Sequence, residues 1–87
     1  YYLPVCPHNC GGPILHYATA HLAANIPNLF ICESVRKHYL DEYVGIVPQT
    51  LPAVEGELPL PPGPGLGVEL SPEVFARPDI KIEVSRA

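Results

Sequence analysis

The sequence has 87 residues, of which 47% are hydrophobic, and a formal net charge of −4 with only five Lys and Arg residues. So few basic residues cannot form the positive surface that neutralises nucleic-acid phosphates or anionic lipid headgroups, and no apolar stretch approaches the roughly 20 residues that cross a bilayer, so we expect neither partner. Three cysteines, an odd number without the spacing of a secreted disulfide framework, favour reduced thiols and a cytoplasmic location.

The first predicted elements are a strand and a helix. The run from Tyr1 to Cys6 is aromatic, branched or apolar, as in a short buried strand already under way at the first residue, so we expect a fragment of a longer protein. Residues 7–12 then supply a loop. Pro13 suits the first turn of a helix, and apolar residues follow near helical spacing, which predicts a helix over 13–25.

A second strand is predicted after this helix. The run from Leu29 to Cys32 has the length and composition of a strand buried on both faces. Two strands joined by one helix in so few residues should lie parallel, with a right-handed crossover, so their C-terminal ends share one edge of the sheet. His8 follows the first strand and Glu33 the second, and we therefore expect both side chains at that edge.

The remaining sequence differs in composition. Residues 34–43 are expected to form a loop or a short helix, and residues 48–67 are too rich in Pro and Gly for a helix or a central strand. The proline run within 58–65 could bind an aromatic groove as a polyproline ligand, but its apolar flanks favour packing on its own protein. Ser71 and Pro72 predict a short helix through Ala76, followed by a strand over 80–84.

His8 and Glu33 are the candidate catalytic residues. Histidine suits a base near neutral pH, and a nearby carboxyl can hold a substrate oxygen or stabilise developing charge. A zinc site built on Cys6, His8 and Cys10 is disfavoured, because structural zinc usually has four ligands in more widely spaced pairs. Packing, side-chain hydrogen bonds or exposure account for the other three histidines without a function; these are His16, His21 and His38.

Three segments resemble the end of the barrel domain in the mandelate racemase and muconate lactonizing branch of the enolase superfamily. They are residues 7–14 (PHNCGGPI), 20–28 (AHLAANIPN) and 31–33 (ICE). The interval between His8 and Glu33, 33 − 8 = 25 positions, is similar to that of galactonate-type sugar-acid dehydratases, which the sequence resembles most, whereas mandelate racemase has a shorter interval. The stretch 56–67 also resembles the tail of this family.

The resemblance implies an α/β fold. Residues 1–47 would be the end of a TIM-type (β/α) barrel, namely its last two strands with one helix. Residues 48–87 would be an extended tail that packs toward an N-terminal capping domain which this sequence does not contain.

The resemblance also implies an activity. His8 corresponds to the general base that removes the proton α to a substrate carboxylate, and Glu33 to the residue that hydrogen-bonds the resulting enediolate. Loss of water from a sugar acid would then give a 2-keto-3-deoxy acid. The implied cofactor is Mg²⁺, whose ligands would lie upstream of Tyr1, so no residue here is assigned to the metal.

Other readings of the sequence stay open. A racemase or cycloisomerase of the same superfamily shares the proton abstraction and differs in the later chemical steps. A truncated, non-catalytic module is an alternative of another class, because the metal ligands and the capping domain are missing. The full-length protein is expected to be a homo-oligomeric lyase, and the fragment alone is expected to be inactive and to fold poorly.

Overall fold

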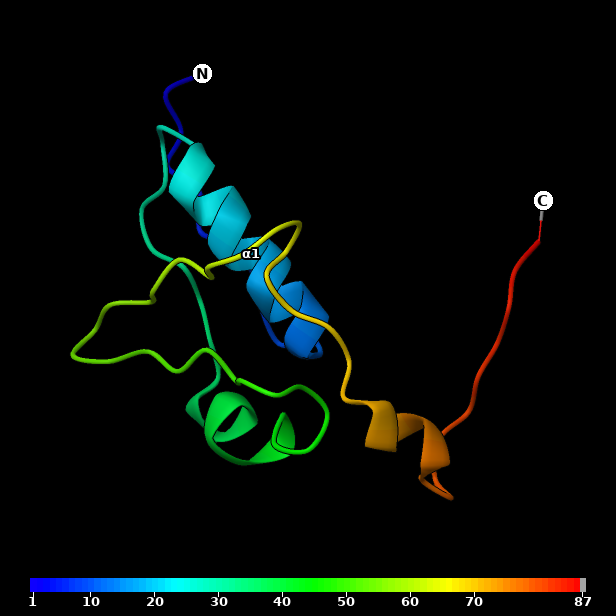
Figure 1. The fold of residues 1–87 in the computed structure, drawn as a ribbon. Helices are drawn as coiled ribbons and strands as arrows, with labels where there is room; N and C mark the ends of the chain where they lie inside the picture. Colours follow the sequence, from blue (N-terminus) through cyan, green and yellow to red (C-terminus); the bar gives the residue numbers. More distant parts are fainter. Residues whose placement is uncertain (87) are drawn as a thin grey trace.

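A computed structural model describes residues 1–86. Its helices are α1 (Pro13–Asn25), the π-helix η1 (His38–Glu42) and the 3₁₀-helix η2 (Pro72–Ala76). Extended segments and turns connect them, and the segment that leads to η2 crosses α1 in Figure 1. None of the helices described is long and apolar enough to cross a membrane.

Helix α1 occupies the residues that the sequence predicts. Pro13 opens it at a position where the missing N–H has no role, and Gly12 before it is extended (φ −75°, ψ 177°). At the other end Ile26 is also extended, because the proline that follows disfavours helical geometry there. The local rules for helix ends therefore fix both boundaries.

The two predicted strands are reduced to one isolated parallel bridge, which has the predicted direction. The first of them is also not buried, because Tyr1 and Tyr2 are fully exposed. Val5 and Leu29 form a parallel bridge, in which the Val5 N–H donates to Asn28 O (2.9 Å) and the Phe30 N–H donates to Val5 O (2.9 Å). Further along, the Glu33 N–H donates to Pro7 O at 3.3 Å. The pairing is thus shorter than predicted but has the predicted direction.

The expected burial of the second strand on both faces is wrong for the described chain. Phe30 is 76% exposed and Ile31 is 56% exposed. A pair of extended segments buries side chains only where a further layer covers it, and residues 1–86 supply no such layer here. The apolar composition of these residues therefore exceeds what this chain alone can bury.

Two small apolar clusters form the core. One joins Tyr17 and Ala20 of α1 to Leu51, with Leu58 and Val68 packed against it. The other is made by the segment around η1 and comprises Tyr39, Tyr43 and Val47. Val68 also packs against the second cluster, so the tail contacts α1 and the segment around η1 through individual residues such as Leu51 and Val68. This part of the tail packs on its own chain, as its composition predicts.

Helix η1 has the wide closure of a π-turn. The Tyr43 N–H donates to His38 O at 2.8 Å, five residues back. Tyr39 of this helix and Tyr43 at its end face the buried ring of His16, at centroid distances of 6.0 Å and 5.8 Å. The π-turn therefore places two aromatic rings against one residue of α1.

The last part of the chain departs from prediction in one respect. The short helix η2 forms, although the Ser71 side chain makes no capping hydrogen bond. The predicted strand over 80–84 is wrong: these residues are extended but pair with no other described segment. Alternating apolar residues form a strand only beside a partner, and the side chains of Ile82 and Val84 are 61% and 74% exposed within the described chain.

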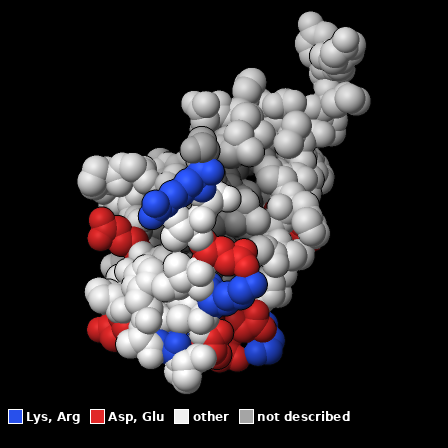
Figure 2. Space-filling view, turned by 90° about the vertical axis from the view of Figure 1, so that its right-hand side faces the viewer, with Lys and Arg blue, Asp and Glu red and all other residues white. Residues whose placement is uncertain are grey.

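Charged side chains are mixed rather than segregated. On the face that Figure 2 shows, Lys and Arg side chains lie next to Asp and Glu side chains. Lys37 Nζ lies 2.7 Å from Asp41 Oδ2, and the Arg77 Nε–H donates to Asp79 Oδ1 at 2.9 Å. These contacts hold the pKa of each aspartate below its usual range and raise the pKa of its basic partner.

Candidate active site

The structure brings His8 and Glu33 together. Each follows one of the two parallel segments, and the Glu33 N–H bonds to Pro7 O, directly before His8. The His8 Nδ1 atom lies 2.6 Å from Glu33 Oε2. Parallel pairing thus places at one edge two side chains that are 25 positions apart, as the strand order predicts.

One carboxylate oxygen of Glu33 has two partners. Besides His8, the Asn9 backbone N–H donates to Oε2 at 3.3 Å. When Nδ1 of a neutral His8 carries the proton that faces Glu33, its lone pair is on Nε2. The His8 side chain is 78% exposed and that of Glu33 is 43% exposed, so Nε2 is open to a ligand. In this arrangement His8 can act as a base whose ring is oriented by the Glu33 carboxylate.

A buried polar network lies directly beneath this pair, and sequence reasoning missed its role. The Asn9 Nδ2–H donates to His16 Nδ1 at 2.8 Å, and the His16 Nε2–H donates to Leu51 O at 2.9 Å. Asn9 and His16 are each only 1% exposed. His16 is thus buried and hydrogen-bonded, as two of the explanations offered for it from the sequence require. Nothing local in the sequence indicates contact with a residue 35 positions away.

Cys10 joins the same edge. Ligand atoms of His8, Cys10 and Glu33 lie within 4.8 Å of one another, so Glu33 rather than Cys6 is the third member of this group. Three ligand atoms are one short of the usual structural zinc set. They also do not fit magnesium, which prefers an octahedron of oxygen ligands. We therefore assign no metal to this group.

Cys6 lies instead near Cys32, whose thiol is partly buried. Burial raises the pKa of Cys32, and the charge of the Cys6 thiolate adds to that shift. A raised pKa keeps Cys32 protonated and a poor nucleophile at neutral pH. Cys32 therefore adds no reactive thiolate to the edge that holds His8 and Glu33.

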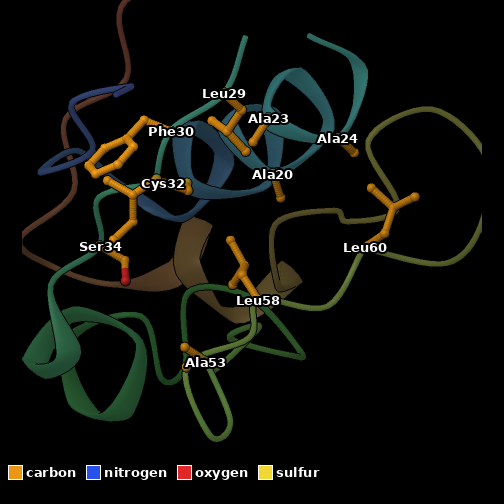
Figure 3. A pocket seen from close by; sticks show the side chains of 12 residues that line it. Ala20, Ala23, Ala24, Leu29, Phe30, Cys32, Ser34, Ala53, Leu58 and Leu60 are labelled. Atoms are coloured by element: carbon orange, nitrogen blue, oxygen red, sulfur yellow. The ribbon is translucent and has the colours of Figure 1, made fainter. Parts of the chain in front are cut away.

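A separate apolar cavity of about 490 Å³ lies between α1 and the tail. Figure 3 shows Ala20 and Ala23 of α1 on one side of it and Leu58 of the tail on the other. Neither His8 nor Glu33 lines it, and Cys32 is its one titratable lining residue in the described chain. Its walls offer no acid or base pair from residues 1–86, so the candidate pair of His8 and Glu33 lies outside this cavity.

Comparisons with known proteins show the family to which this chain belongs. Residues 1–74 match the family described as enolase C-terminal domain-like, and the chain belongs to that family. It is similar to an enolase of the mandelate racemase subgroup from Agrobacterium tumefaciens, known from two crystal structures. Both are 41% identical to it and cover 86% of this chain, with TM-scores of 0.73 and 0.77. Both contain a succinimide residue, and the second also contains sodium and phosphate.

A curated relative has a named activity. D-xylonate dehydratase from Haloferax volcanii is 36% identical over 70 residues, which are 80% of this chain and 17% of that protein. The chain spans about a fifth of the length of these relatives. The predicted superfamily and α/β barrel class are thereby confirmed, whereas the galactonate-type subclass is finer than these similarities resolve.

Proposed function

We propose that the longer protein represented by this chain is a sugar-acid dehydratase, in which His8 is the general base and Glu33 assists it. The contact of 2.6 Å between His8 Nδ1 and Glu33 Oε2, at the ends of two parallel segments, is the observation that carries the proposal. The similarity to a D-xylonate dehydratase supports the substrate class. D-Galactonate is the substrate that the sequence resemblance favours.

His8 would take the proton α to the substrate carboxylate through Nε2. The contact with Glu33 fixes the ring and leaves the Nε2 lone pair directed away from the protein. A proton α to a carboxylate is only very weakly acidic, so its removal needs both a positioned base and electrostatic stabilisation of the enediolate. The exposed ring of His8 supplies the first of these two requirements.

Glu33 would hold the enediolate by a hydrogen bond. A carboxylate and an enediolate oxygen repel each other, so in this role Glu33 has to carry a proton on Oε1, the oxygen that faces neither His8 nor Asn9. Oε2 would stay the acceptor of the two contacts seen in the structure. The two oxygens of one carboxyl group thereby have separate tasks.

Magnesium belongs to this proposal through the family resemblance. A bound Mg²⁺ would supply Lewis-acid stabilisation of the enediolate. The group of His8, Cys10 and Glu33 does not fit that ion, so no described residue is assigned as its ligand. In the full-length enzyme, chelation should abolish turnover and added Mg²⁺ should restore it; full activity after exhaustive chelation would contradict the assignment.

The test uses the full-length protein and a library of sugar acids, with formation of a 2-keto acid as the measured product. His8→Asn should lower kcat by about a thousandfold, within the range for a positioned base, while substrate still binds. Asn keeps an amide near the place of Nδ1 and removes only Nε2. His21→Asn, the same change at the far end of α1, is the matched control and should leave kcat within about twofold.

The nearest competing function is a racemase or cycloisomerase, and the mandelate racemase subgroup of the solved relatives favours it. Both activities begin with the same proton abstraction. The mass of the product separates them: dehydration yields a keto acid with loss of water, whereas racemisation or cycloisomerisation yields an isomer of the substrate. A product that retains all oxygens of the substrate would replace the dehydratase proposal by this one.

A non-catalytic module is the remaining alternative. It predicts that the 87-residue chain, expressed alone, unfolds cooperatively and binds a partner protein. The exposed apolar residues of the second parallel segment argue against it, because a chain that exposes Phe30 and Ile31 is expected to aggregate. Equilibrium unfolding of the isolated chain followed by circular dichroism distinguishes the two cases.

A further inference from the structure

We propose that Asn9 and His16 are positioning residues for the His8–Glu33 pair, and that they tie this pair to the tail segment at Leu51. This inference rests on the proposed function. The base and the carboxyl group have to keep their relative positions during turnover. The buried hydrogen-bonded network below the exposed edge holds them there.

Asn9 connects the network to the reacting groups. It directly follows His8, and its backbone N–H donates to the same Glu33 oxygen that His8 contacts. The place of this one peptide unit therefore sets the distance between imidazole and carboxylate. A displacement of about 1 Å in such an arrangement can lower a rate by about a hundredfold.

The Asn9 side chain is the anchor of that peptide unit. Loop asparagines are mostly exposed, yet this one is 1% exposed and donates its amide to His16 Nδ1 at 2.8 Å. Its Oδ1 atom is buried and has no hydrogen-bond partner in the described chain. Burying an amide group with an unpaired oxygen is unfavourable. The one hydrogen bond to His16 therefore determines the position of the Asn9 side chain.

His16 transmits this anchor to the tail. Since Nδ1 accepts a hydrogen bond from Asn9, the neutral ring carries its proton on Nε2, which donates to Leu51 O. Leu51 adopts φ +52°, which is uncommon for a residue other than glycine. The Leu51 carbonyl accepts the hydrogen bond from His16. An uncommon backbone conformation at this position is expected where the surrounding contacts fix the chain.

A second contact fixes the same loop. The Tyr43 hydroxyl donates to Gly11 O at 2.6 Å, and its ring also lies against His16. The loop is thus held at Asn9 from α1 and at Gly11 by the residue that ends η1. Tyr43 thereby restrains the loop two positions beyond Asn9.

The two ring nitrogens of His16 can be tested separately. Asn at position 16 places a polar group near Nδ1, so His16→Asn keeps the contact to Asn9 and loses the one to Leu51. Gln reaches the place of Nε2, so His16→Gln keeps the contact to Leu51 and loses the one to Asn9. In the full-length enzyme we expect His16→Gln to lower kcat about tenfold with KM within about twofold, and His16→Asn to lower kcat less than about threefold.

Tyr17→Phe is the matched control. It removes the hydrogen bond from the Tyr17 hydroxyl to Gln49 O (2.8 Å), which also ties α1 to the tail but does not involve Asn9. It should lower stability about as much as His16→Gln and leave kcat unchanged. Equal kcat for the two variants, each corrected for the folded fraction measured by circular dichroism, would overturn the positioning role.

A readout independent of turnover completes the test. Amide hydrogen exchange of the peptide that covers residues 7–12 should accelerate in His16→Gln and in Asn9→Ala, but not in Tyr17→Phe. If the wild-type enzyme forms no keto acid from any sugar acid, the proposed function fails while this exchange pattern still decides the positioning role. Unchanged exchange in His16→Gln would refute that role even in an active dehydratase.

Discussion

Residues 48–86 depend more than residues 1–47 on hydrogen bonds that side chains donate to main-chain carbonyls. The first region pairs its backbone groups with each other, in α1 and between the parallel segments. Eight of the twelve prolines lie at or after Pro48, and proline has no N–H, so the second region has more carbonyl acceptors than backbone donors. Several of its main-chain carbonyls accept hydrogen bonds from side chains of the first region instead.

Three side chains of α1, two histidines and a tyrosine, donate these hydrogen bonds. The His16 Nε2–H bonds to Leu51 O, the Tyr17 hydroxyl to Gln49 O, and the His21 Nε2–H to Leu66 O at 3.0 Å. A proline-rich segment can thus be fixed without forming a strand, provided that a neighbouring helix offers long polar side chains. We therefore expect the stability of the tail to depend on α1 more than the stability of α1 depends on the tail.

Tyr17→Ala tests this dependence with the largest expected effect. Tyr17 is 1% exposed and packs against Leu51, so its removal should lower the free energy of unfolding by about 3 kcal/mol. Tyr17→Phe keeps the packing and should cost about 1 kcal/mol. Urea unfolding of the full-length protein gives both values. Amide exchange in residues 48–68 should rise more than exchange in α1, and an equal rise would contradict the dependence.

Gly67→Ala tests the tail from its own side. Gly67 has φ +76°, and a Cβ atom there would collide with the Pro62 carbonyl oxygen. We expect a loss of about 2 kcal/mol from the strained backbone together with the collision. Gly45→Ala is the control in the first region: its φ is +81° but its surroundings are open, so only about 1 kcal/mol should be lost. Urea unfolding of both variants measures the difference.

Alkaline pH should weaken the contacts of both regions. Burial raises the pKa of Tyr17 and of Tyr43 from the ordinary value of 10.0. The unfolded chain then loses its phenolic protons first, so stability is full below about pH 10 and falls as pH rises through the folded-state pKa. The urea midpoint measured from about pH 8 to about pH 11 should decline less steeply in Tyr17→Phe/Tyr43→Phe than in wild type.

Lys81→Ala should have the smallest effect. Lys81 contacts Glu83 near the end of the tail, where both side chains are largely exposed (83% and 74%). Exposed ion pairs contribute little because water and salt screen them. We expect an unchanged urea midpoint, and a clear shift would show that this segment is covered in the full-length protein.

Sequence alone predicts the parts of this chain that local rules govern. The bounds of α1 follow from Pro13 and from the proline after Ile26, and parallel pairing follows from the helix between two apolar runs. The approach of His8 and Glu33 follows from that pairing. These features depend on residues that are neighbours in the chain or that belong to one segment–helix–segment unit.

The rest depends on contacts without a local signal. His16 meets Leu51 across 35 positions and Tyr17 meets Gln49 across 32, and no periodicity in the sequence reports such pairs. The predicted strand over 80–84 is wrong for a related reason: alternation specifies a face, but a strand also needs a partner whose position the segment does not encode. The catalytic roles of His8 and Glu33 stay predictions until turnover is measured.

The π-turn of η1 makes the length of this segment matter more than its composition. Deleting one residue between His38 and Glu42 would favour ordinary α-helical closure, and every later residue would turn by about 100° around the helix axis. Tyr43 would then leave both His16 and the Gly11 carbonyl. Across homologues we therefore expect alignment gaps at this turn to coincide with replacement of Tyr43. An insertion or deletion here lies about 30 positions from the candidate base. It would nevertheless mark a change in the contacts that hold the loop of that base.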